Sequence, residues 1–378
     1  MLQHAPTCSY HNFYSRTLMP VSHYGLWTRI GLGLRIVGFG FFVHTTDYGF
    51  NLQRMLYRKC RVVNTVSSTF AVYRVANHSE FCILTQEISY NLNGTYPNRY
   101  HSYIAASYVK FVEGAGARPV PIWIGENRSY YEDILSKVNG VLWPGGSTYF
   151  FQKAGYADAG AKIYRIAKRI NEEGKYFPIF SICLGFELLT YVAANRVEHR
   201  TSCSSNNQPL PLEFTHDFRE SKLFKNAPPN VLRILAEQNV TANYHHLCVT
   251  KKDLRSVNLT DEFHVLSFNH DKNGLKFIST LEHRQFPFYG LQFHPEKNLY
   301  EWVTGKKIPH GINATIVSQY FANFFVNEVR KNLNEFRTKQ DEQQSLIYNY
   351  PVTYTALQNS SFQQCYMFTK SDRNKFFT

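Results

Sequence analysis

A cysteine at the junction of two apolar segments is the residue of this sequence best suited to nucleophilic chemistry. Cys183 follows the apolar run 177–182 and precedes a helical pattern at 186–194, which predicts a sharp turn between a strand and a helix. The positive end of a helix dipole lowers the pKa of a thiol and raises its reactivity. The amide of Leu184 would also point outward, where it could donate to an oxyanion. The alternative interpretation is a buried structural cysteine.

A histidine and a glutamate downstream could complete a catalytic set. Residues 290–293 are predicted to form a strand that ends at His294-Pro295-Glu296. A thiol nucleophile needs an imidazole within hydrogen-bond reach, and the imidazole needs an acceptor that orients it. Because side chains two apart in an extended segment project to the same side, Glu296 could orient His294. In isolation, the triplet is also typical of a surface histidine beside a turn proline.

Two weaker motifs stand elsewhere in the chain. Pro144-Gly145-Gly146 closes a predicted strand, and its glycine amides could donate to an oxyanion, although ordinary turns share this composition. His245 and His246 are adjacent, but no third ligand falls at a metal-site spacing. The seven cysteines show no CxxC or paired metal spacing either. We therefore expect no metal and no organic cofactor.

From about residue 81 onward, strands alternate with helices, which predicts the elements that position these residues. The pattern favours an α/β fold, with a doubly wound, mostly parallel sheet and helices on both faces. Ligands of such sheets bind at the carboxyl ends of the strands, where the Pro-Gly-Gly turn and Cys183 both fall. Strands are predicted at 81–84, 119–122, 138–143, 177–182, 231–235, 264–268, 275–280 and 288–293. Helices are predicted at 104–115, 159–170, 186–194 and 312–329, with a loop or hairpin at 198–216 and a solvated helix or tail at 330–348.

Composition limits the remaining function classes. The 378 residues carry a net charge of +13, but no dense basic stripe interleaved with aromatic residues appears, so no nucleic-acid partner is expected. No uncharged apolar run of 18 residues occurs, so no stable membrane association is expected. Residues 1–80 are rich in arginine and poor in acids, which fits a displaced signal or anchor centred on 30–43, a transit peptide, or a mis-assigned start. Seven N-x-S/T sequons favour the secretory pathway, and they lie at Asn77, Asn93, Asn127, Asn239, Asn258, Asn313 and Asn359.

The junction at Cys183, the upstream Pro-Gly-Gly and the downstream His-Pro-Glu resemble the class I glutamine amidotransferase-like fold. Within that superfamily the chain is similar to the gamma-glutamyl hydrolases, which hydrolyse folate poly-gamma-glutamates. The resemblance covers residues 82–368 in order and spacing, and it rests on YIAASY (103–108), Gly145-Gly146, CLGFE (183–187), TANYH (241–245), QFHPE (292–296) and SSFQQCY (360–366). It implies a single catalytic domain at 81–368, followed by a short tail at 369–378.

The resemblance also implies a role for each matching residue. Cys183 would be the nucleophile, His294 the general acid and base, Glu296 its orienting partner and His245 a second essential histidine. Gly146 and Leu184 would donate to the oxyanion, and the substrate pocket would be lined by Tyr108, Gly145 and Glu187. Two departures from the family are Cys82, where its first strand usually has glycine, and residues 1–80, which have no counterpart in it.

The implied activity is hydrolysis of gamma-glutamyl amide bonds in poly-gamma-glutamylated folates through a thioester. One alternative is a glutaminase subunit, against which Glu187 weighs because amidotransferases of this fold usually carry Gln there. Another is a catalytically inactive folate-binding glycoprotein. The resemblance further implies a lysosomal or secreted protein, and a homodimer is possible.

Overall fold

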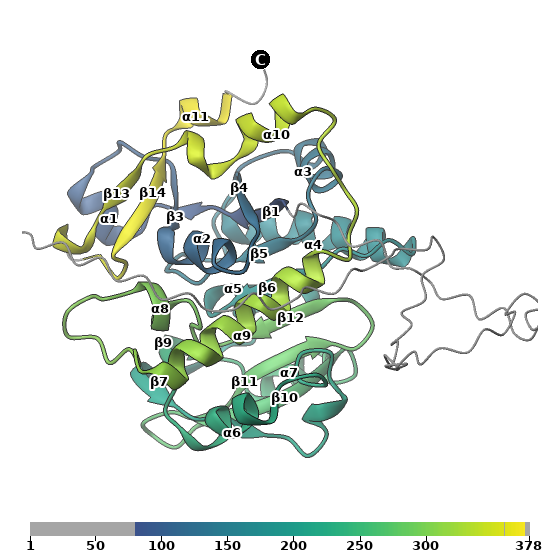
Figure 1. Ribbon diagram of the computed structural model, residues 1–378, viewed down its shortest axis with the longest axis vertical. Coiled ribbons are helices and arrows are strands. Elements are labelled where there is room, and N and C mark those ends of the chain that lie inside the picture. The colour runs from purple at the N-terminus through teal and green to yellow at the C-terminus, as the bar shows by residue number, and fades with distance from the viewer. Residues whose placement is uncertain (1–79, 359, 375–378) are drawn as a thin grey trace, which may run out of the picture. The chain divides into compact units, whose positions relative to one another are not determined.

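The main sheet of the protein places parallel strands side by side at its centre. The computed structural model describes residues 80–358 and 360–374, so the interpretations of residues 1–79, Asn77 and Asn359 lie outside the described residues. Eight strands lie in the order β4-β1-β5-β6-β12-β11-β10-β8. Figure 1 shows this sheet from β4 above to β10 below. The five from β4 to β12 are parallel, and the other three are antiparallel. Their bounds are β1 Glu80–Leu84, β4 Arg118–Ile122, β5 Val141–Trp143, β6 Ile179–Ile182, β8 Glu213–Phe214, β10 Phe263–His270, β11 Lys276–His283 and β12 Phe288–Leu291.

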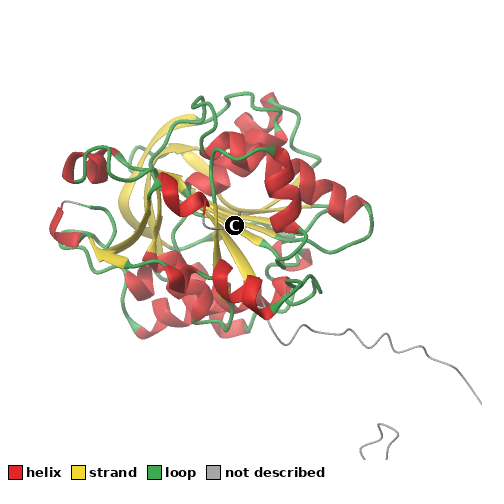
Figure 2. Ribbon diagram, turned by 90° about the horizontal axis from the view of Figure 1, so that it is seen from above, coloured by secondary structure: helices red, strands yellow, loops and turns green. Residues whose placement is uncertain are grey.

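Both faces of this sheet are buried under helices (Figure 2). In β1, Phe81 and Ile83 face one hydrophobic core, whereas Cys82 and Leu84 face the other. One core includes helices α2 (Ala106–Glu113), α6 (Pro229–Glu237) and α9 (Ile312–Val329). The other includes α3 (Arg128–Leu135), α4 (Tyr156–Glu172), α5 (Leu184–Ala193) and α7 (Lys251–Ser256). The predicted doubly wound α/β fold is therefore confirmed.

One predicted element was wrong, and another begins at a different residue. Residues 231–235 are not a strand but the middle of α6, where Val231, Leu232, Ile234 and Leu235 are buried at helical spacing. Pro229 opens this helix, because proline is well suited to a first helical turn. The helix expected from residue 104 begins instead at 106, since residues 102–105 form a strand.

The remaining strands form two small sheets beside the main one. In the first, strands close to the two ends of the described residues pair in the order β13-β14-β3-β2. The second is the antiparallel pair β7 and β9. The loop or hairpin expected at 198–216 is instead mostly the strand β7, whose partner β9 lies outside that range. The bounds are β2 Gln86–Glu87, β3 Ser102–Ala105, β7 Thr201–Leu210, β9 Thr241–Cys248, β13 Val352–Tyr354 and β14 Gln364–Phe368. The short helices are α1 Tyr90–Thr95, α8 Lys297–Tyr300, α10 Lys339–Ser345, α11 Lys370–Asn374, η2 Phe218–Glu220, η3 Ile347–Asn349 and η4 Ala356–Gln358. Within the described ranges, no helix has the length and apolar character needed to cross a membrane.

Candidate active site

Cys183 occupies the sharp turn between β6 and α5, as the sequence predicts. Its φ of +53° lies in the left-handed region, which residues with a side chain rarely adopt. Such local strain is held in place by the surrounding structure and is common at functional sites. Gly185 permits the close approach of α5 to β5, because a Cβ atom at this position would lie 2.0 Å from the carbonyl oxygen of Trp143.

His294 follows β12, the parallel neighbour of β6, and is held by two buried side chains. Its Nδ1 atom lies 2.7 Å from a carboxylate oxygen of Glu296 and 3.2 Å from the hydroxyl of Tyr108. Only 3% of His294 and none of Glu296 is exposed, so the alternative of a surface histidine is wrong. Because Nδ1 faces Glu296, Nε2 is the ring nitrogen left to exchange a proton with a reacting group.

The Pro-Gly-Gly turn brings these groups together with Cys183. The turn follows β5, the other parallel neighbour of β6, and the amide of Gly145 donates to the Tyr108 hydroxyl at 2.8 Å. A Cβ atom on Gly145 would lie 2.7 Å from the His294 ring, 2.7 Å from the Tyr108 hydroxyl and 3.0 Å from Cβ of Cys183. Three side chains from separate parts of the sequence therefore converge on one glycine, and only glycine fits there.

The electrostatics of the thiol differ from the sequence-based expectation. Burial raises the pKa of the Cys183 thiol well above its ordinary value, and the carboxylates of Glu187 and Glu296 raise it further. The ammonium of Lys297 and the amide of Leu184 lower this pKa, but by less. Burial also lowers the pKa of His294, although Glu296 opposes that shift. Both shifts favour the uncharged forms of the pair, a neutral thiol and a neutral imidazole.

A cavity of about 720 Å³ opens beside Cys183. Its walls include six residues to which the sequence assigned a role, namely Gly146, Cys183, Leu184, Glu187, His245 and His294. Tyr108 and Gly145, which we expected to line the substrate pocket, are not among the lining residues. Tyr108 is fully buried, and its hydroxyl contacts the amide of Gly145 and Nδ1 of His294. It therefore lies behind the cavity wall, where it positions Gly145 and His294.

His245 lies in the cavity wall in a neutral, hydrogen-bonded state. Its Nδ1 atom is 3.1 Å from the Leu247 carbonyl, and its Nε2 atom is 3.1 Å from the Asn243 side-chain oxygen. Burial lowers the pKa of His245 to about 3, and the neighbouring His294 adds to this shift. At any pH near neutrality, His245 therefore carries no charge.

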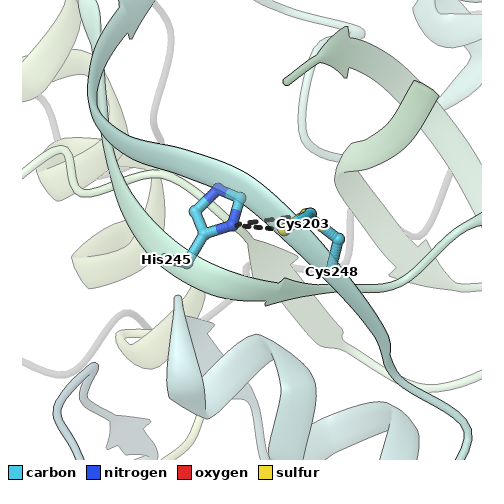
Figure 3. Close-up of side chains that lie close together, drawn as sticks. All are labelled: Cys203, His245 and Cys248. Carbon is cyan, nitrogen blue, oxygen red and sulfur yellow. Dashed lines mark hydrogen bonds between the residues drawn. A yellow bond between two sulfur atoms is a disulfide. The ribbon is translucent and has the colours of Figure 1, made fainter. Parts of the chain in front are cut away.

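A disulfide that the sequence did not reveal lies directly beside this histidine. Cys203 and Cys248 join β7 to β9, and their sulfur atoms lie 3.5 and 3.4 Å from Nδ1 of His245 (Figure 3). These three residues are close enough together to suggest a metal site. However, sulfur atoms bonded to each other cannot act as thiolate ligands, so the cluster supports no metal.

Arg200 is a residue of the cavity wall that the sequence analysis missed. Its guanidinium lies 2.9 Å from the Glu187 carboxylate, 2.6 Å from that of Glu198 and 4.0 Å from the centre of the Phe150 ring. Burial raises the pKa of Glu187 to about 6, whereas Arg200 lowers it. No local sequence pattern could have revealed the pair of Arg200 and Glu187. Arg200 lies beyond the end of α5, and it contacts Glu187 only because the chain turns back towards that helix.

The described sequons differ in their exposure. Asn93, Asn127, Asn239 and Asn258 are exposed, whereas Asn313 is half-buried and donates to Gln238 at 2.9 Å. Four of the sequons are therefore accessible to a glycosylating enzyme on the folded chain.

The strand–cysteine–helix turn, with a histidine just after the adjacent parallel strand, defines a cysteine-dependent hydrolase of α/β fold. A family model for Peptidase C26 matches residues 82–296, and the chain belongs to that family. Gamma-glutamyl hydrolase B of Dictyostelium discoideum is 35% identical over 315 residues, which are 83% of this chain and 87% of that protein. Gamma-glutamyl hydrolase of Homo sapiens is 39% identical over 267 residues, which are 70% of this chain and 83% of that protein. Gamma-glutamyl hydrolase 1 of Arabidopsis thaliana is 33% identical over 277 residues, which are 73% of this chain and 78% of that protein. The resemblance predicted from the motifs is confirmed.

Proposed function

We propose that this protein hydrolyses gamma-glutamyl amide bonds in poly-gamma-glutamylated folates, with Cys183 as the nucleophile. The observation that carries this proposal is the convergence of Cys183, His294 and Tyr108 on Gly145 beside a cavity. The names of its relatives supply the class of bond. A cavity of about 720 Å³ has room for a glutamyl residue and part of what is attached to it.

The first half of the reaction forms a thioester. The Cys183 sulfur attacks the side-chain carbonyl carbon of a glutamyl residue while its proton passes to His294. The developing oxyanion accepts hydrogen bonds from the amides of Gly146 and Leu184. The Leu184 amide is suited to this role, because the first amides of a helix have no partner within the helix and this one is directed at the Cys183 thiol. His294 then gives the proton to the leaving amine, and the carbon–nitrogen bond breaks.

The second half returns the enzyme to its starting state. His294 takes a proton from water, and the water oxygen attacks the thioester carbon. The carbon–sulfur bond breaks, the thiol regains its proton from His294, and the shortened product leaves as a carboxylic acid. Glu296 orients the imidazole throughout and stabilises its positive charge, as a buried carboxylate does in other triads. Tyr108 positions His294 and the turn, and His245 shapes the cavity wall.

The test uses a pteroyl poly-gamma-glutamate, with shortening of the chain followed by chromatography. We expect the protein to shorten it and the Cys183→Ala variant to lose essentially all turnover while its thermal midpoint is retained. Cys365→Ala is the matched control, because Cys365 is also a buried free thiol but does not line the cavity. Turnover that persists in Cys183→Ala would contradict the mechanism. Release of ammonia from free glutamine would indicate a glutaminase, and binding without cleavage would indicate an inactive folate-binding protein.

We also propose that the chain matures in the secretory pathway and acts in the lysosome or outside the cell. The disulfide between Cys203 and Cys248 supports this, because disulfides persist in oxidising compartments. The four exposed sequons described above support it as well. Removal of N-linked glycans from the protein expressed in eukaryotic cells should lower its mass, and an unchanged mass would contradict glycosylation. A homodimer stays a prediction that sedimentation can test.

A further inference from the structure

Lys297 is a buried cation that faces the cavity without a carboxylate partner. Only 4% of the residue is exposed, yet it is among the residues that line the cavity. In the described part of the chain, its ammonium makes neither a hydrogen bond nor an ion pair. Glu296 precedes Lys297 in the chain, and the charge of Lys297 lowers the pKa of Glu301. Neither carboxylate, however, lies within ion-pair distance of the ammonium. Burial of a charge is costly unless the charge is paired, so this position indicates a bound anion.

Two aromatic rings hold the Lys297 ammonium in place. It lies 4.4 Å from the centre of the Phe362 ring and 5.6 Å from the centre of the Tyr244 ring. The faces of aromatic rings attract cations but leave the hydrogen-bonding capacity of an ammonium unused. The three N–H donors of Lys297 are therefore available to an anion in the cavity.

A second ammonium extends this arrangement towards solvent. Lys306 is exposed, lines the same cavity and lies 5.4 Å from the centre of the Tyr244 ring. In the described residues it forms no ion pair either. Two unpaired cations thus share one aromatic ring, and that ring lies 6.2 Å from the ring of His294. A ligand that reaches both ammonium groups would extend from the catalytic pair towards the cavity mouth.

We propose that Lys297, Tyr244 and Lys306 form a subsite that binds alpha-carboxylates of a gamma-linked glutamate chain. This inference rests on the proposed function and deepens it. Each residue of a gamma-linked chain keeps its alpha-carboxylate free, so a row of anions accompanies the amide bonds. Lys297 binds the carboxylate of the glutamyl residue whose carbonyl Cys183 attacks. Lys306 binds the next carboxylate along the chain. The subsite therefore aligns the scissile bond and selects gamma-linked chains with free carboxylates.

The test compares two substrates that differ in a single group. One is a pteroyl di-gamma-glutamate, and the other carries an alpha-carboxamide in place of the alpha-carboxylate on the residue that is attacked. A hydrogen bond to a charged group is strong enough to give a preference of at least about tenfold in kcat/KM for the carboxylate. In Lys297→Gln, KM for the carboxylate substrate should rise about tenfold, and the preference should fall to near one. Lys297→Arg should restore much of the preference, which separates loss of charge from loss of shape.

The exposed cation and its neighbour provide the controls. Lys306→Gln should raise KM only about two- to fivefold, because exposed ion pairs are weaker than buried ones. Lys307→Gln is the matched control, since Lys307 is also exposed but does not line the cavity, and it should leave both substrates unchanged. An undiminished preference in a folded Lys297→Gln would overturn the subsite.

Binding separates the subsite from the proposed reaction. Calorimetry with the Cys183→Ala protein measures affinity for the same two compounds without turnover. Preferential binding of the carboxylate that is lost with Lys297→Gln would support the subsite even where hydrolysis fails. Equal binding of both compounds would overturn the subsite even where hydrolysis succeeds.

Discussion

Replacement of Glu296 by glutamine isolates the charge that supports the imidazole of His294, which we propose as the general base. Glu296 is fully buried, and one carboxylate oxygen lies 2.7 Å from Nδ1 of His294. Glutamine has the same shape and keeps an oxygen that can accept from Nδ1, but it has no charge. Because Glu296 raises the pKa of His294 against the effect of burial, its loss should lower that pKa further.

The size of the effect follows from the kind of hydrogen bond that is lost. A hydrogen bond to a charged group contributes about 1.5–3 kcal/mol, and about 1.36 kcal/mol corresponds to a factor of ten in rate. The Glu296→Gln variant should therefore lose about 10- to 150-fold in kcat. Activity requires a neutral imidazole, so it falls as the pH drops through the pKa of His294. This acid limb should move to lower pH in the variant.

The assay is a pH profile of kcat for cleavage of a pteroyl poly-gamma-glutamate between pH 4 and 8. Glu328→Gln serves as the control, because Glu328 is also buried and accepts a hydrogen bond from Tyr289 at 2.7 Å, yet does not line the cavity. An acid limb that stays in place or moves to higher pH in Glu296→Gln would refute the reasoning. So would a kcat equal to that of the unmodified protein.

Three further changes test other parts of the structure. Tyr108→Phe removes the acceptor of a buried amide, which should cost about 1–3 kcal/mol of stability and lower kcat more than it changes KM, measured by urea unfolding and steady-state kinetics. Arg200→Met leaves Glu187 buried and unpaired, which should cost about 3–5 kcal/mol at pH 7. The pKa of Glu187 is already raised to about 6 by burial, so protonation should make this cost smaller at pH 5, and an equal cost at both pH values would contradict the pairing. Removal of the disulfide by Cys203→Ser with Cys248→Ser should cost about 2–4 kcal/mol, because it frees a segment of 45 residues, and an unchanged unfolding midpoint would contradict it.

The parts of the site that the sequence predicted are those governed by local pattern. An apolar strand that runs into Cys-Leu-Gly and a helix predicts the turn at Cys183, because glycine two residues later allows the helix to approach the sheet. The proximity of His294 required one more assumption, that the strand before it is parallel to β6. The structure satisfies that assumption, since β12 pairs with β6 although more than 100 residues separate them.

The parts that the sequence missed depend on contacts between distant segments. Arg200 reaches Glu187 only because the chain turns back after α5, and Cys203 pairs with Cys248 among seven cysteines only because β7 and β9 are adjacent. The strand predicted at 231–235 failed for the opposite reason. A short run of buried apolar residues has the same composition in a strand and in a helix. Only the length of the run and the prolines before it could have distinguished the two structures.

The way in which the thiol is activated shows how local and global effects compete at one atom. The ammonium of Lys297 and the Leu184 amide favour the thiolate, but burial and the carboxylates of Glu187 and Glu296 outweigh them, so the pKa of Cys183 is raised. In the mechanism that we propose, the proton therefore passes to His294 during the attack rather than before it. A substrate carboxylate on Lys297 would cancel a charge that now lowers the pKa of the thiol, and this would favour the neutral pair still further. The proposed catalysis then depends on the geometry of proton transfer, for which Glu296 and Tyr108 hold the imidazole of His294, rather than on a preformed thiolate.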